Sequence, residues 1–344
     1  MNNRSINPKD LETDSYDYFL PAELIAQRPI DSISRDKSKL LIYNVSRDLV
    51  IHESFSRIGD YLPKESLIVF NQSKVFPSRL LGQKPTGGKV EVFLLSASPD
   101  IENEFEVLIK TRSKKHIGDE FLFPNELKAK ITKILDDGTF KVSFNYLPDA
   151  LYLDRFAKIP IPPYIRDGES DQLDKENYQT VYAKITGSVA APTAGLHFTD
   201  KLLNELKTKN IDQAFVTLHV GIGTFRPVTV DRLKDHKMHF ENFFVNQENL
   251  IKINKNKNVF AVGTTSLRVL ESMKRFEVLP DQNYATNIFL HPGVPVTSIK
   301  GLITNFQLPK STLLMLVSAL IGREKALEIY SSSGEHNQTC LFRP

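Results

Sequence analysis

Short runs of apolar residues dominate the first half of the chain and predict β-structure. Residues 40–43 and 49–51 flank a polar turn, which predicts a strand pair near the N-terminus. Turn sequences at Thr86-Gly87-Gly88 and Asp136-Asp137-Gly138 lie between later runs. These later β-rich runs occupy residues 67–70, 89–95, 105–109, 120–123, 127–134 and 139–144. Together they predict a small six-stranded antiparallel β-barrel.

After residue 150 the spacing becomes helical and alternates with buried strands. Helices are expected at 199–209 and 266–275, and strands at 214–218 and 259–262. A short helix is also expected to begin at Pro21. The N-terminal segment is too short to form a core alone. The sequence therefore predicts an α/β sandwich domain built from both chain ends, residues 1–66 and 151–344, with the barrel of residues 67–150 inserted.

Composition indicates the class of protein but does not identify its binding partner. The chain has 344 residues, 41% hydrophobic and 25% charged, which is typical of globular proteins. Its apolar runs are too short to cross a bilayer and its start lacks a signal-peptide core, so we expect a cytoplasmic protein, with a monomer favoured. The single cysteine, Cys340, excludes internal disulfides and Cys-rich zinc sites. A net charge of +3 does not by itself indicate nucleic-acid binding.

The segment 187–199 combines small residues with a histidine just before a predicted helix. Gly195 removes side-chain bulk, so backbone can approach a ligand closely, and Thr193 offers a hydroxyl. His197 supplies a group that titrates near neutral pH. The alternative interpretation is a packed loop with a structural histidine.

A second small-residue loop, 218–227, directly follows a predicted strand. Gly221 and Gly223 resemble the start of a dinucleotide-binding motif, but the third glycine is missing and Pro227 interrupts any following helix. A nicotinamide or flavin nucleotide site is therefore rejected. The loop's other candidate residues for ligand contact or proton transfer are His219, Thr224 and Arg226.

His236, His239 and Glu241 lie close together in the sequence. Their spacing does not match the helical His-Glu-x-x-His metal site, so no metal is expected. An imidazole and a carboxylate held near one another can instead serve acid–base catalysis. The alternative is a solvated charged loop.

Two strand-to-helix turns carry hydroxyls and amides. The first contains Gly263, Thr264 and Thr265, which can contact ribose or phosphate oxygens, although helix capping by Thr265 or Ser266 explains part of the pattern. The second, residues 303–312, contains candidate ligand contacts and a candidate helix cap. These are Asn305 and Lys310 as contacts, and Ser311 or Thr312 as the cap.

Positive charge also gathers in the predicted barrel. Residues 71–79, which include Arg79, and residues 110–116 place basic side chains beside hydroxyls and an aromatic ring. Such groups can contact RNA phosphates and bases. A solvated loop is the alternative.

Taken together, these segments resemble the S-adenosylmethionine:tRNA ribosyltransferase-isomerase family of queuosine biosynthesis. The resemblance extends from about residue 16 to residue 330. It is carried by Tyr16-Asp17-Tyr18-Phe19-Leu20-Pro21, residues 25–29, 86–92, 162–165, 178–183, 188–199, 217–228, 263–266 and 304–312. It implies transfer of the ribosyl part of S-adenosylmethionine to 7-aminomethyl-7-deazaguanine at the wobble position of tRNA. Epoxyqueuosine-tRNA, adenine and methionine would be the products, with S-adenosylmethionine a consumed substrate and no cofactor or metal.

The resemblance also implies roles for the candidate residues. His197, His219, His239 and Glu241 are expected to include the acid–base groups. Arg79 and Arg226 would contact acceptor RNA or the donor's carboxylate. The remaining candidates for substrate binding are Thr193, Gly195, Gly221, Thr224, Gly263, Thr264, Thr265, Asn305 and Lys310.

The chain departs from the family pattern at two places. Gln307 stands where the family usually has histidine, and residues 331–344 lack the family's terminal Phe-Ser-Tyr-Gly-Asp segment. These departures motivate the main alternative function, a catalytically impaired tRNA-binding homologue. A nucleoside-handling enzyme without an RNA substrate is a further alternative.

Overall fold

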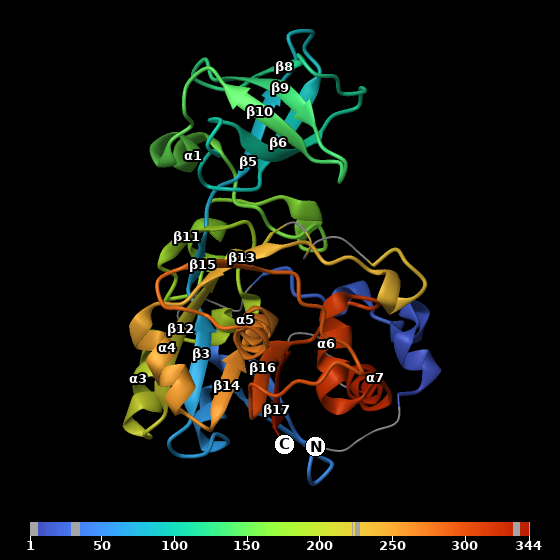
Figure 1. Ribbon diagram of the computed structural model, residues 1–344, viewed down its shortest axis with the longest axis vertical. Helices are drawn as coiled ribbons and strands as arrows, with labels where there is room; N and C mark the ends of the chain where they lie inside the picture. The colour runs from blue at the N-terminus through green and yellow to red at the C-terminus, as the bar shows by residue number, and fades with distance from the viewer. Residues whose placement is uncertain (1–5, 29–34, 222, 224–227, 333–337, 344) are drawn as a thin grey trace. The chain divides into compact units, whose positions relative to one another are not determined.

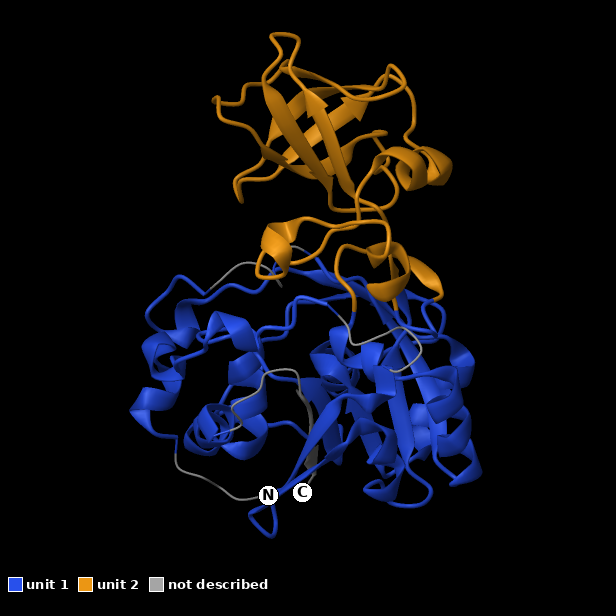
Figure 2. Cartoon of the chain, turned by 180° about the vertical axis from the view of Figure 1, so that it is seen from behind, with its two compact units in different colours: residues 1–73, 180–183, 192–344 blue, residues 74–179, 184–191 orange. Residues whose placement is uncertain are grey.

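The chain folds into two compact units. The computed structural model describes residues 6–28, 35–221, 223, 228–332 and 338–343. The larger unit comprises Met1–Ser73, Thr180–Ala183 and Pro192–Pro344, and the smaller unit comprises Lys74–Gln179 and Lys184–Ala191 (Figure 2). Among the described residues, no helix has both the length and the apolar character needed to span a membrane.

A mixed sheet forms the centre of the larger unit (Figure 1). In the described part of the chain it has nine strands, in the spatial order β15-β13-β12-β3-β14-β16-β17-β1-β2. The four central strands β12, β3, β14 and β16 are mutually parallel. The strands are β1 (Lys39–Asn44), β2 (Leu49–Ser54), β3 (Leu67–Asn71), β12 (Asp212–Leu218), β13 (Glu241–Phe244), β14 (Val259–Val262), β15 (Asn283–Thr286), β16 (Gly301–Asn305) and β17 (Gln338–Arg343).

Helices cover both faces of this sheet. On one face Ile68 and Phe70 of β3 pack with Phe198 and Leu206, in a core that includes η5 (Phe55–Asp60), η7 (Thr193–His197) and α3 (Asp200–Thr208). The helices α4 (Gln247–Lys255) and α5 (Gly263–Arg275) contact β3 and β12. Because successive side chains of a strand point to opposite faces, β3 is buried along its whole length. Two further helices, α6 (Thr312–Ile321) and α7 (Arg323–Ser332), pack against each other.

A closed antiparallel barrel forms most of the smaller unit. Its strands follow the order β10-β7-β6-β5-β8-β9. Alternate residues such as Leu80, Val92, Val107 and Ile131 fill its interior. The strands are β5 (Arg79–Gln83), β6 (Lys89–Leu94), β7 (Phe105–Lys110), β8 (Glu120–Leu122), β9 (Lys128–Ile134) and β10 (Phe140–Phe144). The unit's other elements are β4 (Ser73–Val75), α1 (Ala150–Phe156), η6 (Arg166–Gly168), α2 (Asp174–Asn177) and β11 (Ile185–Ser188).

The predicted fold class, an α/β domain with an inserted antiparallel barrel, is confirmed. The assignment of residues 67–70 to the barrel is wrong, because they form β3 in the centre of the larger sheet. The sixth barrel strand is instead β5, which begins at Arg79 in a segment interpreted as a basic loop. Residues 151–179 also belong with the barrel rather than with the larger unit. Lys158 forms a bridge with Arg79 of β5, which ties this segment to the barrel.

Of the predictions made from local sequence patterns, some are confirmed and others are wrong. The predicted strand pair is the β1–β2 hairpin, and Thr199 and Ser311 cap α3 and α6 as expected. Capping of α5 by Thr265 or Ser266 is wrong, because this helix begins at Gly263 and its N-cap position is occupied by Val262. The helix expected from Pro21 is a single 3₁₀ turn, η3 (Ala22–Leu24).

The C-terminal segment contributes a strand inside the sheet. The strand β17 runs parallel to β1 and antiparallel to β16, so it has a neighbour on each side. Through β17, the β1–β2 hairpin joins the central parallel strands. The segment predicted to depart from the family pattern therefore forms part of the sheet's hydrogen-bonded framework.

We predict that Leu341→Pro lowers the free energy of unfolding by about 2 kcal/mol or more, because proline removes an N–H from a strand paired on both sides. Chemical denaturation of the purified variant measures this loss. Ile101→Pro is the control, since Ile101 is fully exposed at the second position of a tight turn closed by Asn103 and Asp100, where proline is favoured. Equal stability of the two variants would contradict an interior position for β17.

Candidate active site

Four segments that are distant in the sequence meet at one edge of the larger unit's sheet. Because β3, β12, β14 and β16 are parallel, their carboxyl ends lie at the same edge (Figure 1). His219 and Gly221 follow β12, Gly263 follows β14, and Asn305 ends β16. The 3₁₀ turn η7 contacts both β16 and α5, which brings His197 to the same edge. Carboxyl edges of this kind are where open α/β sheets bind ligands.

His197 is held at both ring nitrogens. Its Nε2 lies 2.9 Å from Oδ1 of Asn305, and its Nδ1 lies 2.8 Å from the hydroxyl of Ser38. Since the carboxamide oxygen can only accept, Nε2 carries the proton and Nδ1 accepts from the serine. Burial lowers the pKa of His197 to about 4, although the hydrogen bond with Asn305 acts in the opposite direction. At neutral pH this imidazole is uncharged and fully engaged, so it fixes η7 to β16.

Gln307 supports this arrangement. Its side-chain amide donates to the hydroxyl of Thr304 at 3.0 Å and to the backbone carbonyl of Asn305 at 2.8 Å. The hydroxyl of Tyr18 donates to the Gln307 carbonyl. Gln307 therefore holds the end of β16, directly beside the amide that contacts His197.

Close packing explains two of the predicted glycines. A Cβ at Gly195 would overlap the hydroxyl of Tyr182 and lie 2.9 Å from Cγ2 of Thr180. Gly263 has φ of 82°, and a Cβ there would lie 3.9 Å from the Cβ of Ala194, so the start of α5 lies against η7. Both positions require glycine for structural reasons.

The hydroxyls predicted at these turns differ in burial. Thr264 is buried at the start of α5, whereas Thr193 and Thr265 are partly buried. The Oγ1 of Thr265 is itself shielded from solvent, and no described residue hydrogen-bonds with it. These hydroxyls thus lie where the prediction placed them, at the turns that meet at the sheet edge.

Glu241 forms a buried ion pair that sequence analysis missed. At the start of β13, its Oε2 accepts a hydrogen bond from Nη1 of Arg268, and both side chains are about 95% buried. Its Oε1 accepts from the backbone N–H of Gly221 at 3.1 Å. A carboxylate engaged in this way orients other groups and is poorly suited to the predicted acid–base role. In the sequence, the only indication of a role for Arg268 was its charge, because its neighbours in the predicted helix are apolar or small.

His219 follows β12, and His239 precedes β13, the strand that pairs with β12. The backbone N–H of His219 donates to the carbonyl of Asn242 at 2.9 Å, which places His219 alongside β13. Burial lowers the pKa of His219, and its shielded Nδ1 has no hydrogen-bond partner among the described residues. His239 is partly exposed, and a Cβ at Gly223 would lie 3.0 Å from Cδ2 of its ring.

The other histidine of this segment, His236, packs against an aromatic ring. The ring of His236 packs edge-on against Phe289, and burial lowers its pKa. Within the described ranges, the one group of three acidic, histidine or cysteine residues close enough to share an ion is on an exposed turn of the barrel, at Asp100, Glu102 and Glu104.

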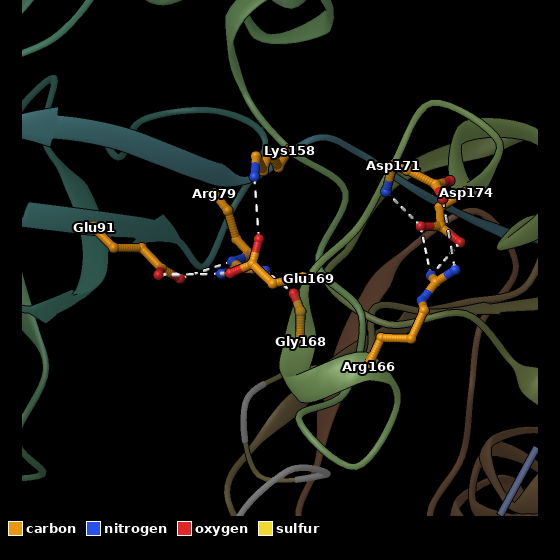
Figure 3. A network of polar contacts seen from close by, with 8 residues as sticks. All are labelled: Arg79, Glu91, Lys158, Arg166, Gly168, Glu169, Asp171 and Asp174. Atoms are coloured by element: carbon orange, nitrogen blue, oxygen red, sulfur yellow. Dashed lines mark hydrogen bonds and ion pairs between the residues drawn. The ribbon is translucent and has the colours of Figure 1, made fainter. Parts of the chain in front are cut away.

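Arg79 lies in the smaller unit and has no free guanidinium to offer. It donates to both oxygens of Glu91, at 2.7 and 3.1 Å, and to the backbone carbonyl of Gly168 (Figure 3). Glu169 lies 3.8 Å away and also pairs with Lys158. This buried network ties β5 to the segment around η6, so the predicted contact with RNA or a substrate carboxylate does not fit Arg79.

The three remaining predicted contacts are Lys310, Thr224 and Arg226. Lys310 forms ion pairs with Asp14 and Asp17 at 3.0 and 3.1 Å. Thr224 and Arg226 lie outside the described residues.

The barrel carries a separate open groove of about 860 Å³. Lys89, Lys110 and Arg112 line it together with apolar residues such as Leu81 and Val90. The predicted basic segment 110–116 thus contributes its first residues to this groove.

We predict that Gly195→Ala lowers the free energy of unfolding by about 1–3 kcal/mol, because the added methyl group overlaps the Tyr182 hydroxyl. Gly88→Ala is the matched control, since nothing lies within 4 Å of a Cβ at that position. Thermal unfolding of both variants tests the packing, and an unchanged melting temperature for Gly195→Ala would contradict it.

The low pKa of His197 predicts a pH-dependent stability. Below pH 6.5 the unfolded chain binds a proton at this histidine that the folded chain does not, so the free energy of unfolding falls as the pH decreases from about 6.5 to about 4. The loss reaches about 3 kcal/mol at most. Denaturation across this range should show a shallower dependence in His197→Gln than in the unaltered chain, while the exposed-residue control His52→Gln should match the unaltered chain.

Comparison with known proteins identifies the family. A family profile described as "Queuosine biosynthesis protein" matches residues 13–337. S-adenosylmethionine:tRNA ribosyltransferase-isomerases from Acetivibrio thermocellus and Thermosipho melanesiensis are 45% and 42% identical, each over 93% of this chain and 94% of the relative. The crystal structure of S-adenosylmethionine tRNA ribosyltransferase from Thermotoga maritima is similar with a TM-score of 0.51 and 29% identity, covering 95% of this chain and 99% of that one. The chain therefore belongs to the S-adenosylmethionine:tRNA ribosyltransferase-isomerase family.

Proposed function

We propose that this chain transfers and isomerises the ribosyl moiety of S-adenosylmethionine onto 7-aminomethyl-7-deazaguanine at the wobble position of tRNA. The products are epoxyqueuosine-tRNA, adenine and methionine. The observation that carries this proposal is the match to ribosyltransferase-isomerases over 93% of the chain. S-adenosylmethionine acts as a consumed substrate, and the reaction uses no resident cofactor or metal. The protein works in the cytoplasm as a monomer.

The chemistry requires a base and an acid. The positive sulfonium acidifies the neighbouring C5′ hydrogens of the donor, so a neutral imidazole can remove one of them and start an elimination. The departing adenine then needs a proton. The elimination breaks the C4′–O4′ bond, and the freed oxygen forms a carbonyl at C1′ as adenine leaves with that proton. The aminomethyl nitrogen adds to C4′ and gives up a proton, and C5′ then bonds to C1′. The alkoxide formed at C1′ displaces methionine from C5′, which gives the epoxide.

The environment of each histidine supports a division of these roles. His219 has a neutral ring and an Nδ1 without a hydrogen-bond partner among the described residues, which suits the base. His239 is partly exposed on the neighbouring segment, which suits the group that protonates adenine. Both nitrogens of His197 are engaged, so it positions η7 and does not transfer protons.

The alternative is a catalytically impaired tRNA-binding homologue, suggested by Gln307 and the divergent tail. Two observations favour the active enzyme. The amide of Gln307 makes two hydrogen bonds that hold the end of β16, and β17 is paired on both sides. Both departures thus fill structural positions.

Adenine release from S-adenosylmethionine tests the proposal. The purified chain should release adenine when tRNA bearing 7-aminomethyl-7-deazaguanine is present, and not with unmodified tRNA. We expect His219→Gln to lower kcat by about 10²–10⁴, with the exposed control His52→Gln unaffected. Since burial lowers the pKa of His219, the acidic limb of kcat/KM should fall below pH 6.5.

Three outcomes would contradict this account. Binding of modified tRNA without adenine release would support the impaired homologue. Adenine release without any tRNA would support a nucleoside-handling enzyme. Full activity in His219→Gln would show that His219 is not the base, although the proposed reaction would still hold.

A further inference from the structure

Arg268 has unused hydrogen-bonding capacity in a buried position. It is 5% exposed and lies in the second turn of α5, the helix that starts at the carboxyl end of β14. Its Nη1 donates to Glu241. Its Nε and Nη2 are shielded from solvent, and no residue within the described ranges accepts from them. An unsatisfied buried donor costs about 1–3 kcal/mol, and more when it is charged, so these atoms call for a partner.

The two unpartnered nitrogens form one side of the guanidinium. Nε–H and one Nη2–H point in the same direction in the plane of the group, and this pair of donors matches the two oxygens of a carboxylate. Glu241 holds the opposite corner through Nη1, and Gly221 in turn holds Glu241 through its backbone N–H. The guanidinium is therefore fixed in orientation before any ligand binds.

Other unpartnered polar atoms belong to the same segments. Oγ1 of Thr265 and Oγ of Ser266, in the first turn of α5, are shielded and lack partners among the described residues. The same holds for Nδ1 of His219, beyond the end of β12. Buried donors and acceptors without partners are rare in folded proteins, so each of these atoms calls for a partner such as a polar ligand.

The charge of the ion pair indicates which kind of anionic ligand fits. Arg268 and Glu241 together are neutral, so a bare phosphate would add net negative charge to a buried region. An amino-acid group adds a carboxylate and an ammonium at once. Its carboxylate can bind the free side of Arg268 while its positive charge is compensated by Glu241, which keeps the region neutral.

We propose that Arg268 binds the α-carboxylate of the methionine part of S-adenosylmethionine through Nε and Nη2, with Glu241 as its positioning residue. This inference rests on the proposed function, since it assigns one contact for that donor. It also changes the role of Glu241 from acid–base catalyst to the group that orients the carboxylate receptor. The competing source of an anionic group, a tRNA phosphate, is an outcome of the test.

Equilibrium binding of two donors tests the proposal on the unaltered chain. S-adenosylmethionine and its decarboxylated analogue share the sulfonium and the nucleoside but differ in the carboxylate. We expect S-adenosylmethionine to bind at least 10-fold tighter. Equal affinities would overturn the proposal without any variant, while adenine release by the same preparation would show that the proposed function still holds.

The variant Arg268→Lys tests whether Arg268 causes this difference in affinity between the two donors. Lysine keeps the charge but lacks the paired donors, so the affinity for S-adenosylmethionine should fall about 10-fold or more while that for the decarboxylated analogue stays within about two-fold. The control is Arg323→Lys, at another guanidinium of the larger unit that pairs with a carboxylate, Asp10, at 2.9 Å. Unchanged S-adenosylmethionine affinity in folded Arg268→Lys would overturn the proposal. An equal loss for both donors, or a loss of affinity for tRNA alone, would also overturn it.

Discussion

The site depends on the parallel pairing of β12, β3, β14 and β16. Parallel strands place their carboxyl ends together, whatever the length of the chain between them. The turns at His219, Gly263 and Asn305 are therefore neighbours, although more than 80 residues separate the first from the last. The 3₁₀ turn η7 joins them because His197 bonds to Asn305 and Gly195 packs against Tyr182.

Buried charge then gives the edge its chemical character. A guanidinium and a carboxylate that are both shielded from water are costly unless each is well compensated. Glu241 is satisfied by Arg268 and Gly221, but among the described residues Arg268 has an acceptor on one side only. The imidazole of His197 is neutral and engaged, whereas no described residue bonds with Nδ1 of His219. The two histidines thus differ in what they can do because their hydrogen-bond partners differ.

Sequence patterns predicted what local physics controls. The β1–β2 hairpin, the caps at Thr199 and Ser311, and the strand at residues 259–262 follow from periodicity and side-chain hydrogen bonding alone. The errors arose where tertiary structure decides. An apolar run such as β3 is compatible with a barrel or with a doubly covered sheet, and β5 is concealed by Arg79 and Gly82.

The candidate site was predictable in part for the same reason. Small residues and histidines after buried strands indicated which turns matter, and those turns lie at one edge. The partners of each side chain depend on long-range contacts, so the pairing of Arg268 with Glu241 and of Arg79 with Glu91 could not be predicted from spacing. The role of Gln307 in holding Asn305 was equally hidden, because it depends on hydrogen bonds that residue spacing does not reveal.

A crystal structure of the chain with S-adenosylmethionine bound tests this account most directly. The account predicts electron density for the donor at the carboxyl edge of β12, β14 and β16, beside η7 and the start of α5. Density for the donor in the barrel groove lined by Lys110 and Arg112, with the sheet edge empty, would contradict it.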